Sequence, residues 1–388
     1  MFIQNVPKII GREKISININ FVSSRYFISA FIFVVFLLAS FPKTGSNTAL
    51  ADKGYNYKVK CGEVNSTSPQ PISATMLIGG AESGKEGENA ATEWFLNRAD
   101  GGDYLVLRFG RVRKQADWIC DNYESLVSSA AELAINTREA ANDPDVEQYI
   151  RDAEALFIAG GDQNAYQDTW EGTDVEDAIN YLINDKGVPV AGTSAGMAIL
   201  GEYYYAPAGK DGVLSSEILE DPFHRNTEDI DRSDFIDIPF LKNTITDTHL
   251  DRLKRPQYPE TRYGRLFGFL ARVVDDNGIP AYGIGSEEGA FVAIDEEGIA
   301  TVFGNGENRG SDAYFLQAQE MPERLEPDRP LIWDSNGKAV KVYRIRGTAE
   351  GSGSFDLNDW ESASGGSWEY WYTTDGESGF IRDAVGCN

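Results

Sequence analysis

The stretch VPVAGTSAGMAIL, residues 188–200, decides how the surrounding chain is expected to fold. Its first four residues form an apolar run typical of a buried strand, and its last four favour a helix. Between them, GTSAG at 192–196 has the G-x-S-x-G pattern of a sharp strand-to-helix turn. Such a turn holds its serine at the apex with the hydroxyl exposed, so we expect a reactive serine at Ser194.

Apolar runs and helical patterns alternate along the chain on both sides of this turn. Nearly continuous apolar strands separated by helices indicate an α/β fold with a mostly parallel, doubly wound sheet. Ligands of such sheets bind beyond the carboxyl ends of the strands, where Gly79-Gly80, Gly160-Gly161 and Ser194 fall. The expected strands are Thr75–Ile78, Tyr104–Phe109, Ala155–Ala159, Val188–Ala191 and Thr244–Thr246, and the expected helices are Glu88–Arg98, Tyr123–Arg138, Val146–Arg151 and Val175–Ile183.

The pattern changes after about residue 280. Ala290–Ile294 and Ile299–Phe303 flank the acidic turn DEEG and predict a hairpin. From about Leu331 the chain is rich in Gly, Ser, Trp and Tyr and alternates like strands. We therefore expect an N-terminal leader at 1–51, an α/β domain carrying Ser194 at 52–310, and a small C-terminal β appendage at 311–388.

The leader has the layout of a signal peptide. A basic segment precedes the apolar stretch Phe27–Phe41, and Ala49-Leu50-Ala51 gives an A-x-A cleavage site. This apolar stretch is shorter than the roughly 18–20 residues that a stable membrane span needs. We expect a secreted or periplasmic protein with no stable span after processing; the alternative is a membrane anchor formed by residues 27–41.

The charge and the cysteines limit the classes of partner and cofactor. Without its leader the chain has 30 basic and 60 acidic side chains, a formal charge of −30. Such a charge repels nucleic acid, so none is expected as a partner. Two histidines leave no His-rich metal site, and we expect no metal or cofactor. One disulfide among Cys61, Cys120 and Cys387 fits an exported protein, with the pairing open.

A serine nucleophile needs a base, and only His224 and His249 exist. His249 ends the segment NTITDTH at 243–249, which reads as a strand leading into a loop at the same sheet edge as Ser194, whereas His224 lies in a polar segment. We therefore expect His249 to be the base. The carboxylate that orients it stays open between Glu217, Asp247, Glu287 and Glu288, with Glu217 favoured. The backbone N–H groups of Ala195 and of the Gly160-Gly161 turn, that of Gly161 above all, are the expected oxyanion donors.

Several segments together resemble a known family. AGGDQ at 159–163, GTSAG at 192–196 and DTH at 247–249 are similar to the signatures of cyanophycinase-like serine peptidases, relatives of dipeptidase E. RYGRL at 262–266 and GIGSEE at 283–288 resemble later segments of that family. The resemblance covers about residues 73–305.

This resemblance implies a class I glutamine-amidotransferase-like fold with Ser194 as nucleophile and His249 as base. It also implies that four residues lie near the substrate: Gln163, Asp247, Arg262 and Arg265. The chain departs from the family in two places. Thr248 stands where cyanophycinases have glutamine, and the segment 250–261 is longer than usual and adds Asp251, Arg252, Lys254 and Arg255.

The sequence thus favours an exported serine peptidase that cleaves aspartyl or isoaspartyl bonds of a peptide substrate. Acidic neighbours of the pocket and the negative charge suit an arginine-rich peptide such as cyanophycin. An α/β-hydrolase esterase and a non-catalytic binding protein on the same scaffold are the alternatives. The oligomeric state stays open, with a homodimer as one candidate.

Overall fold

The computed structural model describes residues 53–80, 86–208, 212–232, 235–252, 260–306 and 311–384. The expected leader at 1–51, the anchor alternative at 27–41, Cys387, Lys254 and Arg255 lie outside these ranges. Residues 52–388 group into one compact unit. The unit is mixed α/β, with two sheets that both contain parallel strands.

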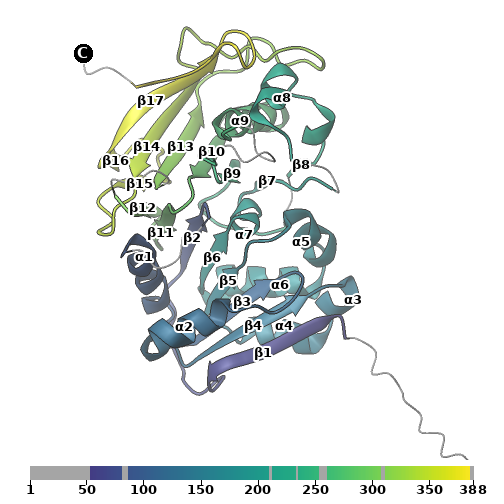
Figure 1. Ribbon diagram of the computed structural model, residues 1–388, viewed down its shortest axis with the longest axis vertical. Helices are drawn as coiled ribbons and strands as arrows, with labels where there is room; N and C mark the ends of the chain where they lie inside the picture. Colours follow the sequence, from purple (N-terminus) through teal and green to yellow (C-terminus); the bar gives the residue numbers. More distant parts are fainter. Residues whose placement is uncertain are drawn as a thin grey trace, which may run out of the picture. The chain divides into compact units, whose positions relative to one another are not determined.

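The first sheet has ten strands in the order β1-β4-β3-β5-β6-β2-β11-β12-β15-β16 (Figure 1). Its strands from β4 to β2 are parallel, and those on either side of this block pair antiparallel. These bounds make up the sheet: β1 Tyr55–Gly62, β2 Ala74–Ile78, β3 Asp103–Arg108, β4 Ser129–Ile135, β5 Ala155–Ile158, β6 Pro189–Thr193, β11 Phe291–Ile294, β12 Ile299–Phe303, β15 Ser354–Asp356 and β16 Ala363–Ser364.

Helices cover both faces of the parallel block because its side chains alternate between two apolar clusters. On β3, Tyr104 and Val106 join the cluster that includes residues of α1 and α2, whereas Leu105 and Leu107 join the cluster that includes residues of α4, α5 and α6. The helices of this half are α1 Glu86–Asn97, α2 Gln115–Tyr123, α3 Arg138–Ala141, α4 Pro144–Arg151, α5 Gln163–Trp170, α6 Asp174–Tyr181 and α7 Ala195–Ala198.

The second sheet has eight strands in the order β18-β17-β14-β13-β10-β9-β7-β8, and only β7, β9 and β10 run parallel. Helix α9 packs on one face of this sheet: its Phe267 shares a cluster with Leu316, whereas Phe315 points into the cluster shared with the first sheet. The bounds are β7 Tyr203–Tyr205, β8 Ile230–Arg232, β9 Thr244–Thr248, β10 Tyr282–Ser286, β13 Asp312–Ala318, β14 Val340–Arg346, β17 Gly366–Thr373, β18 Phe380–Ala384, α8 Ser215–Glu220 and α9 Tyr263–Asn277.

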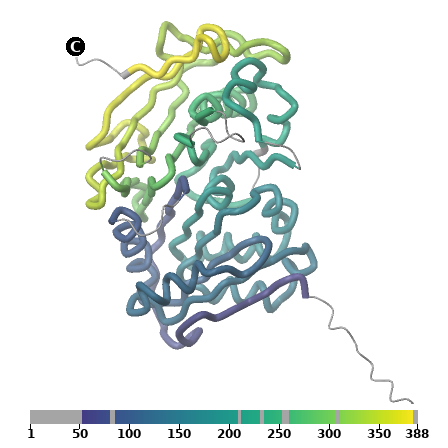
Figure 2. The backbone as a smooth tube through the Cα atoms, in the orientation of Figure 1, coloured from purple at the N-terminus to yellow at the C-terminus, as the bar shows by residue number. Residues whose placement is uncertain are grey.

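Three expectations need correction. The segment 123–138 was expected to be one helix, but it contains the buried strand β4, because β1 and β3 pair with it on both sides. A mostly parallel sheet holds only for the central strands, since later strands are joined as antiparallel neighbours. Residues 311–384 form no separate appendage, because their strands extend both sheets. Figure 2 shows the yellow end of the chain beside green segments.

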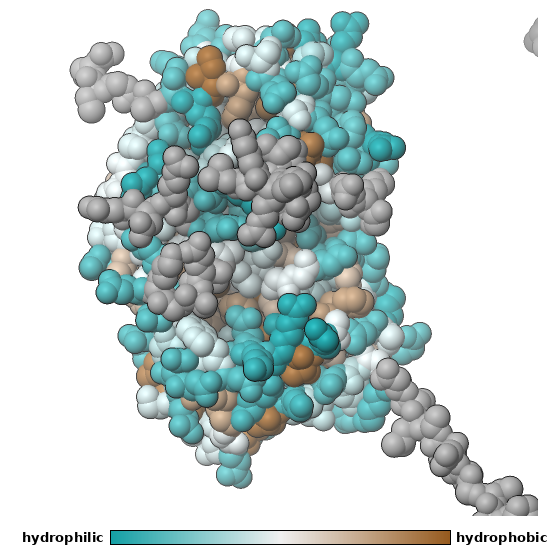
Figure 3. Space-filling view, in the orientation of Figure 1, coloured by the Kyte–Doolittle hydropathy of each residue, from teal (hydrophilic) through white to brown (hydrophobic). Residues whose placement is uncertain are grey.

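The other strands and helices expected around Ser194 are present within one to two residues of their predicted ends. The hairpin predicted at 290–303 is confirmed as β11 and β12. Across the described ranges, no helix is both long and apolar enough to cross a membrane. The face seen in Figure 3 is mostly hydrophilic, with hydrophobic residues in small patches.

A disulfide joins Cys61 on the edge strand β1 to Cys120 on α2. The two cysteines are 59 residues apart in the sequence. A cross-link that closes a loop of this size lowers the conformational entropy of the unfolded chain, which raises the free energy of unfolding by about 4 kcal/mol. We therefore expect Cys120→Ser to lower the unfolding free energy by about 2–4 kcal/mol. Denaturation in urea measures this, and equal stability of the variant and the parent under oxidising conditions would contradict it.

Candidate active site

Ser194 lies between β6 and α7 in an unusual backbone conformation, with φ 52° and ψ −117°. The turn is tight because glycines flank it. A Cβ at Gly192 would lie 2.4 Å from the carbonyl oxygen of Gly196, and a Cβ at Gly196 would lie 2.1 Å from that of Ile158. The Ser194 N–H donates to the Ile78 carbonyl at 3.0 Å. The G-x-S-x-G pattern therefore forms the sharp turn that the sequence predicts.

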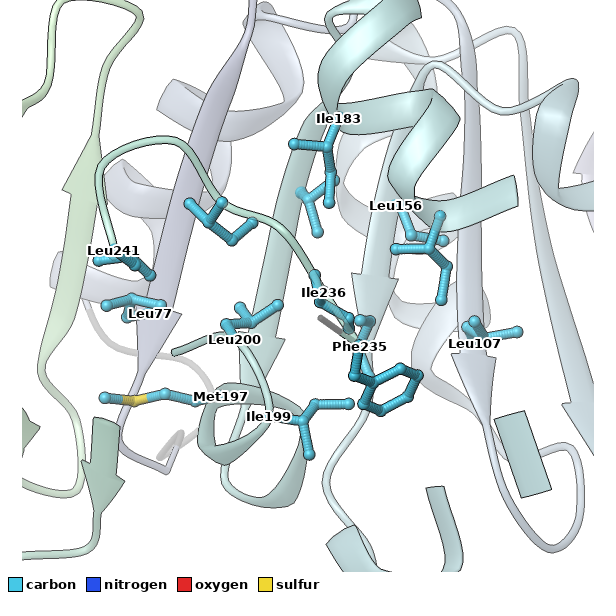
Figure 4. Packing of buried hydrophobic residues seen from close by; sticks show 14 of the residues in the cluster. Leu77, Leu107, Leu156, Ile183, Met197, Ile199, Leu200, Phe235, Ile236 and Leu241 are labelled. Carbon is cyan, nitrogen blue, oxygen red and sulfur yellow. The ribbon is translucent and has the colours of Figure 1, made fainter. Parts of the chain in front are cut away.

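Buried apolar side chains pack against the turn that carries Ser194. The residues that follow Ser194 enter an apolar cluster, in which Ile199 lies beside Phe235 and Leu77 beside Leu241 (Figure 4). Packing of this kind can maintain a strained backbone angle that the serine alone would not adopt. The members of the cluster seen in Figure 4 include Leu77, Met197, Ile199, Leu200, Phe235, Ile236 and Leu241.

The backbone of Ser194 gives a prediction that is independent of activity. At an ordinary site alanine is more stabilising than glycine, but at positive φ a Cβ is strained. We therefore expect Ser194→Gly to be more stable than Ser194→Ala by about 1 kcal/mol, although both lack the hydroxyl. Thermal unfolding of the two variants measures the difference, and a more stable alanine variant would show that the turn is relaxed.

His249 follows β9 and faces the serine. The Ser194 hydroxyl lies 2.8 Å from Nε2 of His249, so it can donate its proton to the ring. The His249 backbone N–H donates to the Gly79 carbonyl at 3.1 Å. Gly80 leaves room for the ring, because a Cβ there would lie 2.4 Å from Cε1 of His249. The Gly79-Gly80 end of β2 thus positions the imidazole, as the expectation of a shared sheet edge requires.

The carboxylate that meets the imidazole is Glu288. Its Oε1 lies 2.8 Å from Nδ1 of His249, so the ring carries its proton on Nδ1 when Nε2 accepts from Ser194. Glu217, the favoured candidate, is wrong as the orienting acid. Its carboxylate instead accepts from the Leu214 N–H at 2.9 Å, at the start of α8. Glu217 stabilises that helix end.

The position of Glu288 follows from strand register. β10 runs parallel to β9 with Ser286 opposite Thr248, so the residues after both strands emerge side by side. Glu288 is held there by its backbone N–H, which donates to Oδ1 of Asp251 at 3.0 Å. The parallel pairing of β9 with β10, both of which end in polar residues, is the signal that could have identified this acid.

His249 sits in a setting that favours its neutral form. Burial, followed by the positive charges of Arg262 and Arg252, lowers the pKa of His249 from 6.5 to about 3. The ring is therefore neutral at physiological pH and able to accept a proton from Ser194.

This shift predicts the pH dependence of Ser194 reactivity. The neutral imidazole persists well below pH 6.5, so the rate of covalent labelling of Ser194 should stay flat from pH 8 to about 5. Arg252→Gln removes a positive charge near the imidazole, which raises the pKa of His249, so the fall in labelling rate at low pH should begin at a higher pH. Between pH 6.5 and 3 the unfolded chain binds a proton that folded His249 does not, so this group's contribution to stability falls as the pH falls. A labelling rate that halves near pH 6.5 would contradict the expectation.

A cavity of about 870 Å³ opens beside Ser194 and His249. Ala195 and Gly161, the expected oxyanion donors, both line it. A Cβ at Gly160 would lie 3.3 Å from Cβ of Ser194, so the Gly160-Gly161 turn passes next to the serine. Tyr166 fixes that turn through a 2.6 Å hydrogen bond from its hydroxyl to the Ala159 carbonyl.

The four residues expected near the substrate also line the cavity, but with different surroundings. Asp247 and Arg265 are both buried and pair with each other through two hydrogen bonds, one of them 2.9 Å long between Nε and Oδ2. Arg262 donates to the Thr248 carbonyl at 3.1 Å, and Gln163 donates to the Tyr205 carbonyl at 3.2 Å. Substrate contacts at these positions stay a prediction.

The lining is not predominantly acidic, contrary to the expectation from the overall charge. Within the described part of the chain its charged side chains are Arg225, Arg252, Arg262 and Arg265 against Glu217, Asp247 and Glu260. Asp247 is already neutralised by Arg265. The cavity beside Ser194 is therefore suited to an anionic group of a ligand, although the net charge of the chain is strongly negative. In the same ranges, no group of three or more His, Cys, Asp or Glu side chains could hold a metal ion.

A serine at a strained turn, an imidazole and a carboxylate hydrogen-bonded in series define the geometry of a Ser–His–Glu triad on an α/β fold. The chain order is serine, histidine, acid, whereas α/β-hydrolases have serine, acid, histidine. The order therefore disfavours the α/β-hydrolase alternative.

Known proteins whose sequences match this chain are also peptidases. The model of peptidase family S51 matches residues 75–216, which include the Ser194 turn. A cyanophycinase from Geminocystis herdmanii is 27% identical over 154 residues, which are 38% of this chain and 56% of that protein. A cyanophycinase from Nostoc sp. is 24% identical over 237 residues, covering 60% of this chain and 71% of that protein. The chain thus spans little more than half of the first relative. On these matches the chain is similar to the cyanophycinase-like peptidases of family S51.

Solved structures of two peptidases were also found. A peptidase from an acI-B1 actinobacterium has a TM-score of 0.42 at 16% identity, over 64% of this chain and 91% of that one. A peptidase E protein from Listeria monocytogenes EGD-e has a TM-score of 0.33 at 11% identity, over 61% of this chain and all of that one.

Proposed function

We propose that this chain is a serine peptidase of cyanophycinase type that hydrolyses aspartyl or isoaspartyl peptide bonds through an acyl-enzyme on Ser194. The observation that carries the proposal is the series of two 2.8 Å contacts from Ser194 through His249 to Glu288. We also propose that the parallel block around Ser194 is a class I glutamine-amidotransferase-like fold, as the family relationship suggests.

In the proposed reaction the Ser194 oxygen attacks the scissile carbonyl carbon while Nε2 of His249 takes the hydroxyl proton. Glu288 holds the ring through Nδ1 and stabilises the imidazolium that forms. The N–H groups of Ala195 and Gly161 stabilise the oxyanion. The tetrahedral intermediate collapses as the C–N bond breaks and His249 gives its proton to the leaving amine. Water then attacks the ester with the same base, which frees Ser194.

The cavity supports an aspartyl substrate. The arginines near His249, Arg252 and Arg262, suit a free carboxylate on the acyl side of the bond. Glu260 lines the same cavity and gives a cationic side chain, such as that of an arginine-rich peptide, an opposite charge to meet. We therefore propose β-Asp-Arg and related isoaspartyl dipeptides as substrates.

Mass spectrometry of reaction products tests the substrate. Purified protein should release the two amino acids from β-Asp-Arg or shorten cyanophycin, and Ser194→Ala should release neither. Hydrolysis of p-nitrophenyl esters without peptide cleavage would favour an esterase instead. Release of peptides by the Ser194→Ala variant would place the activity elsewhere.

We further propose that the protein is exported, with cleavage after Ala51. The support is the sequence of the leader together with the Cys61–Cys120 disulfide, since disulfides persist in oxidising compartments. N-terminal sequencing of protein recovered outside the cytoplasm should begin at Asp52. Protein found on membranes with an intact N-terminus would favour an anchor instead.

The oligomeric state is a separate prediction: sedimentation analysis tests whether the protein is a homodimer.

A further inference from the structure

Glu287 is a buried carboxylate that the proposed mechanism does not use. It follows β10, directly precedes Glu288, and is 6% exposed. Its Oε1 accepts hydrogen bonds from the hydroxyls of Tyr263, at 2.5 Å, and Tyr314, at 3.1 Å. Its Oε2 accepts from the Asp312 N–H at 3.1 Å. Three donors from two separate elements therefore fix this side chain.

The backbone of Glu287 is held as firmly as its side chain. Its N–H donates to the Asp312 carbonyl at 3.0 Å, and its own carbonyl accepts from the Ala290 N–H at 3.1 Å. A Cβ at Gly79 would lie 2.2 Å from the Glu287 carbonyl oxygen, so the end of β2 packs directly against it. Gly79 also accepts the backbone hydrogen bond of His249. The same short segment thus supports the base and the residue before the acid.

Strands from the end of the chain support this arrangement. Asp312, which donates to Glu287, pairs through its carboxylate with Nε of Arg344, at 2.6 Å, and Nε of Arg346, at 3.0 Å, on β14. The guanidinium of Arg382 on β18 lies 3.7 Å from the ring centre of Tyr263, the first residue of α9. Residues 311–384 therefore connect through two partners to the segment that carries Glu288.

Fewer contacts hold Glu288 itself. Its side chain is 37% exposed and meets His249 through Oε1, and its backbone N–H donates to the Asp251 carboxylate. Packing does not lock a carboxylate so exposed into one rotamer, so its contact with His249 depends on a backbone that keeps the Cβ where one rotamer reaches Nδ1. The adjacent residue supplies that fixation, because Glu287 and Glu288 share a peptide bond and point to different partners.

We propose that Glu287 is a positioning residue: its contacts with Tyr263, Tyr314 and Asp312 fix the backbone so that Glu288 meets Nδ1 of His249. The C-terminal strands thereby contribute to the active site without touching the substrate. This inference rests on the proposed function, because positioning matters to the reaction only if His249 acts as the base.

Labelling of Ser194 by a fluorophosphonate, which needs no knowledge of the substrate, tests the proposal. The variants are Glu287→Gln, which keeps the size but presents an amide to three donors, and the milder Tyr314→Phe, which removes one hydroxyl. Tyr343→Phe is the matched control: Tyr343 is a buried tyrosine on β14 whose hydroxyl accepts from the Gly366 N–H on β17, at 2.8 Å, instead of donating to Glu287. The second readout is the downfield proton resonance of the His249 Nδ1–H.

Both test variants should lower the labelling rate at saturating probe by about tenfold, while the half-saturating concentration changes by less than about twofold. The Nδ1–H resonance should shift or broaden, and Tyr343→Phe should leave both readouts unchanged. If Glu287→Gln does not fold, Tyr314→Phe carries the test. Unchanged rates and an unchanged resonance in folded variants would overturn the proposal. Absence of labelling in the parent protein would instead count against the proposed function, and the resonance would still report on Glu288.

Discussion

Ser194→Ala is expected to reduce hydrolysis of β-Asp-Arg by at least about 10⁴-fold, because the proposed reaction forms its acyl-enzyme on the Ser194 oxygen. The Ser194 hydroxyl is the atom that His249 Nε2 meets at 2.8 Å. Alanine removes that oxygen and leaves the turn, the cavity and the imidazole in place. The measurement is the turnover number from product formation at saturating substrate.

Two controls make this result interpretable. The circular dichroism spectrum of Ser194→Ala should match that of the parent, since the turn is held by glycines and by the apolar cluster beneath it. Thr193→Ser changes the preceding residue and keeps the nucleophile, so it should retain most of the activity. Turnover within about tenfold of the parent in Ser194→Ala would mean that Ser194 is not the nucleophile.

Glu288→Gln is expected to lower the turnover number by about 10²- to 10⁴-fold. An amide at this position can donate to Nδ1 and stabilise the wrong tautomer, in which Nε2 carries the proton and cannot accept one from Ser194. The substrate affinity should change much less, because Glu288 lies behind the imidazole as seen from the serine. Steady-state kinetics separate the two effects.

Glu217→Gln is the matched comparison for this variant. The sequence favours Glu217 as the acid, but its carboxylate accepts from the Leu214 N–H at the start of α8. We expect this variant to lose about 0.5–1 kcal/mol of stability, with an effect on turnover at least tenfold smaller than that of Glu288→Gln. The reverse ranking of the two variants would restore Glu217 as the orienting acid.

Much of the parallel block could be predicted from the sequence because it depends on local signals. The apolar runs of β2, β3, β5 and β6 are buried, apart from the partly exposed Thr193 at the end of β6, and they end in glycine or polar turns. The segment SAAELAI at 129–135 misled the prediction, since its alanines favour a helix when read alone. Pairing with β1 and β3, which local sequence does not reveal, makes it a strand.

The contrast between local signals and long-range pairing also explains which site residues could be predicted. Ser194 and His249 could be predicted because a turn motif marks one, and the other is one of two histidines. The acid could not be selected, since the candidates were distinguished only by the strand next to β9. Asp247 and Arg265 line the cavity, and although they are 18 residues apart in the chain they also form a buried pair. Long-range pairings of this kind are not visible in one sequence.

Mapping of the fluorophosphonate adduct tests the central claim most directly. After labelling and digestion of the parent protein, tandem mass spectrometry should find one phosphonylated residue, Ser194, and the adduct should be absent from His249→Ala. Modification of other serines with Ser194 left unmodified, or equal labelling of Ser194 without the histidine, would contradict a triad in which this imidazole activates this hydroxyl.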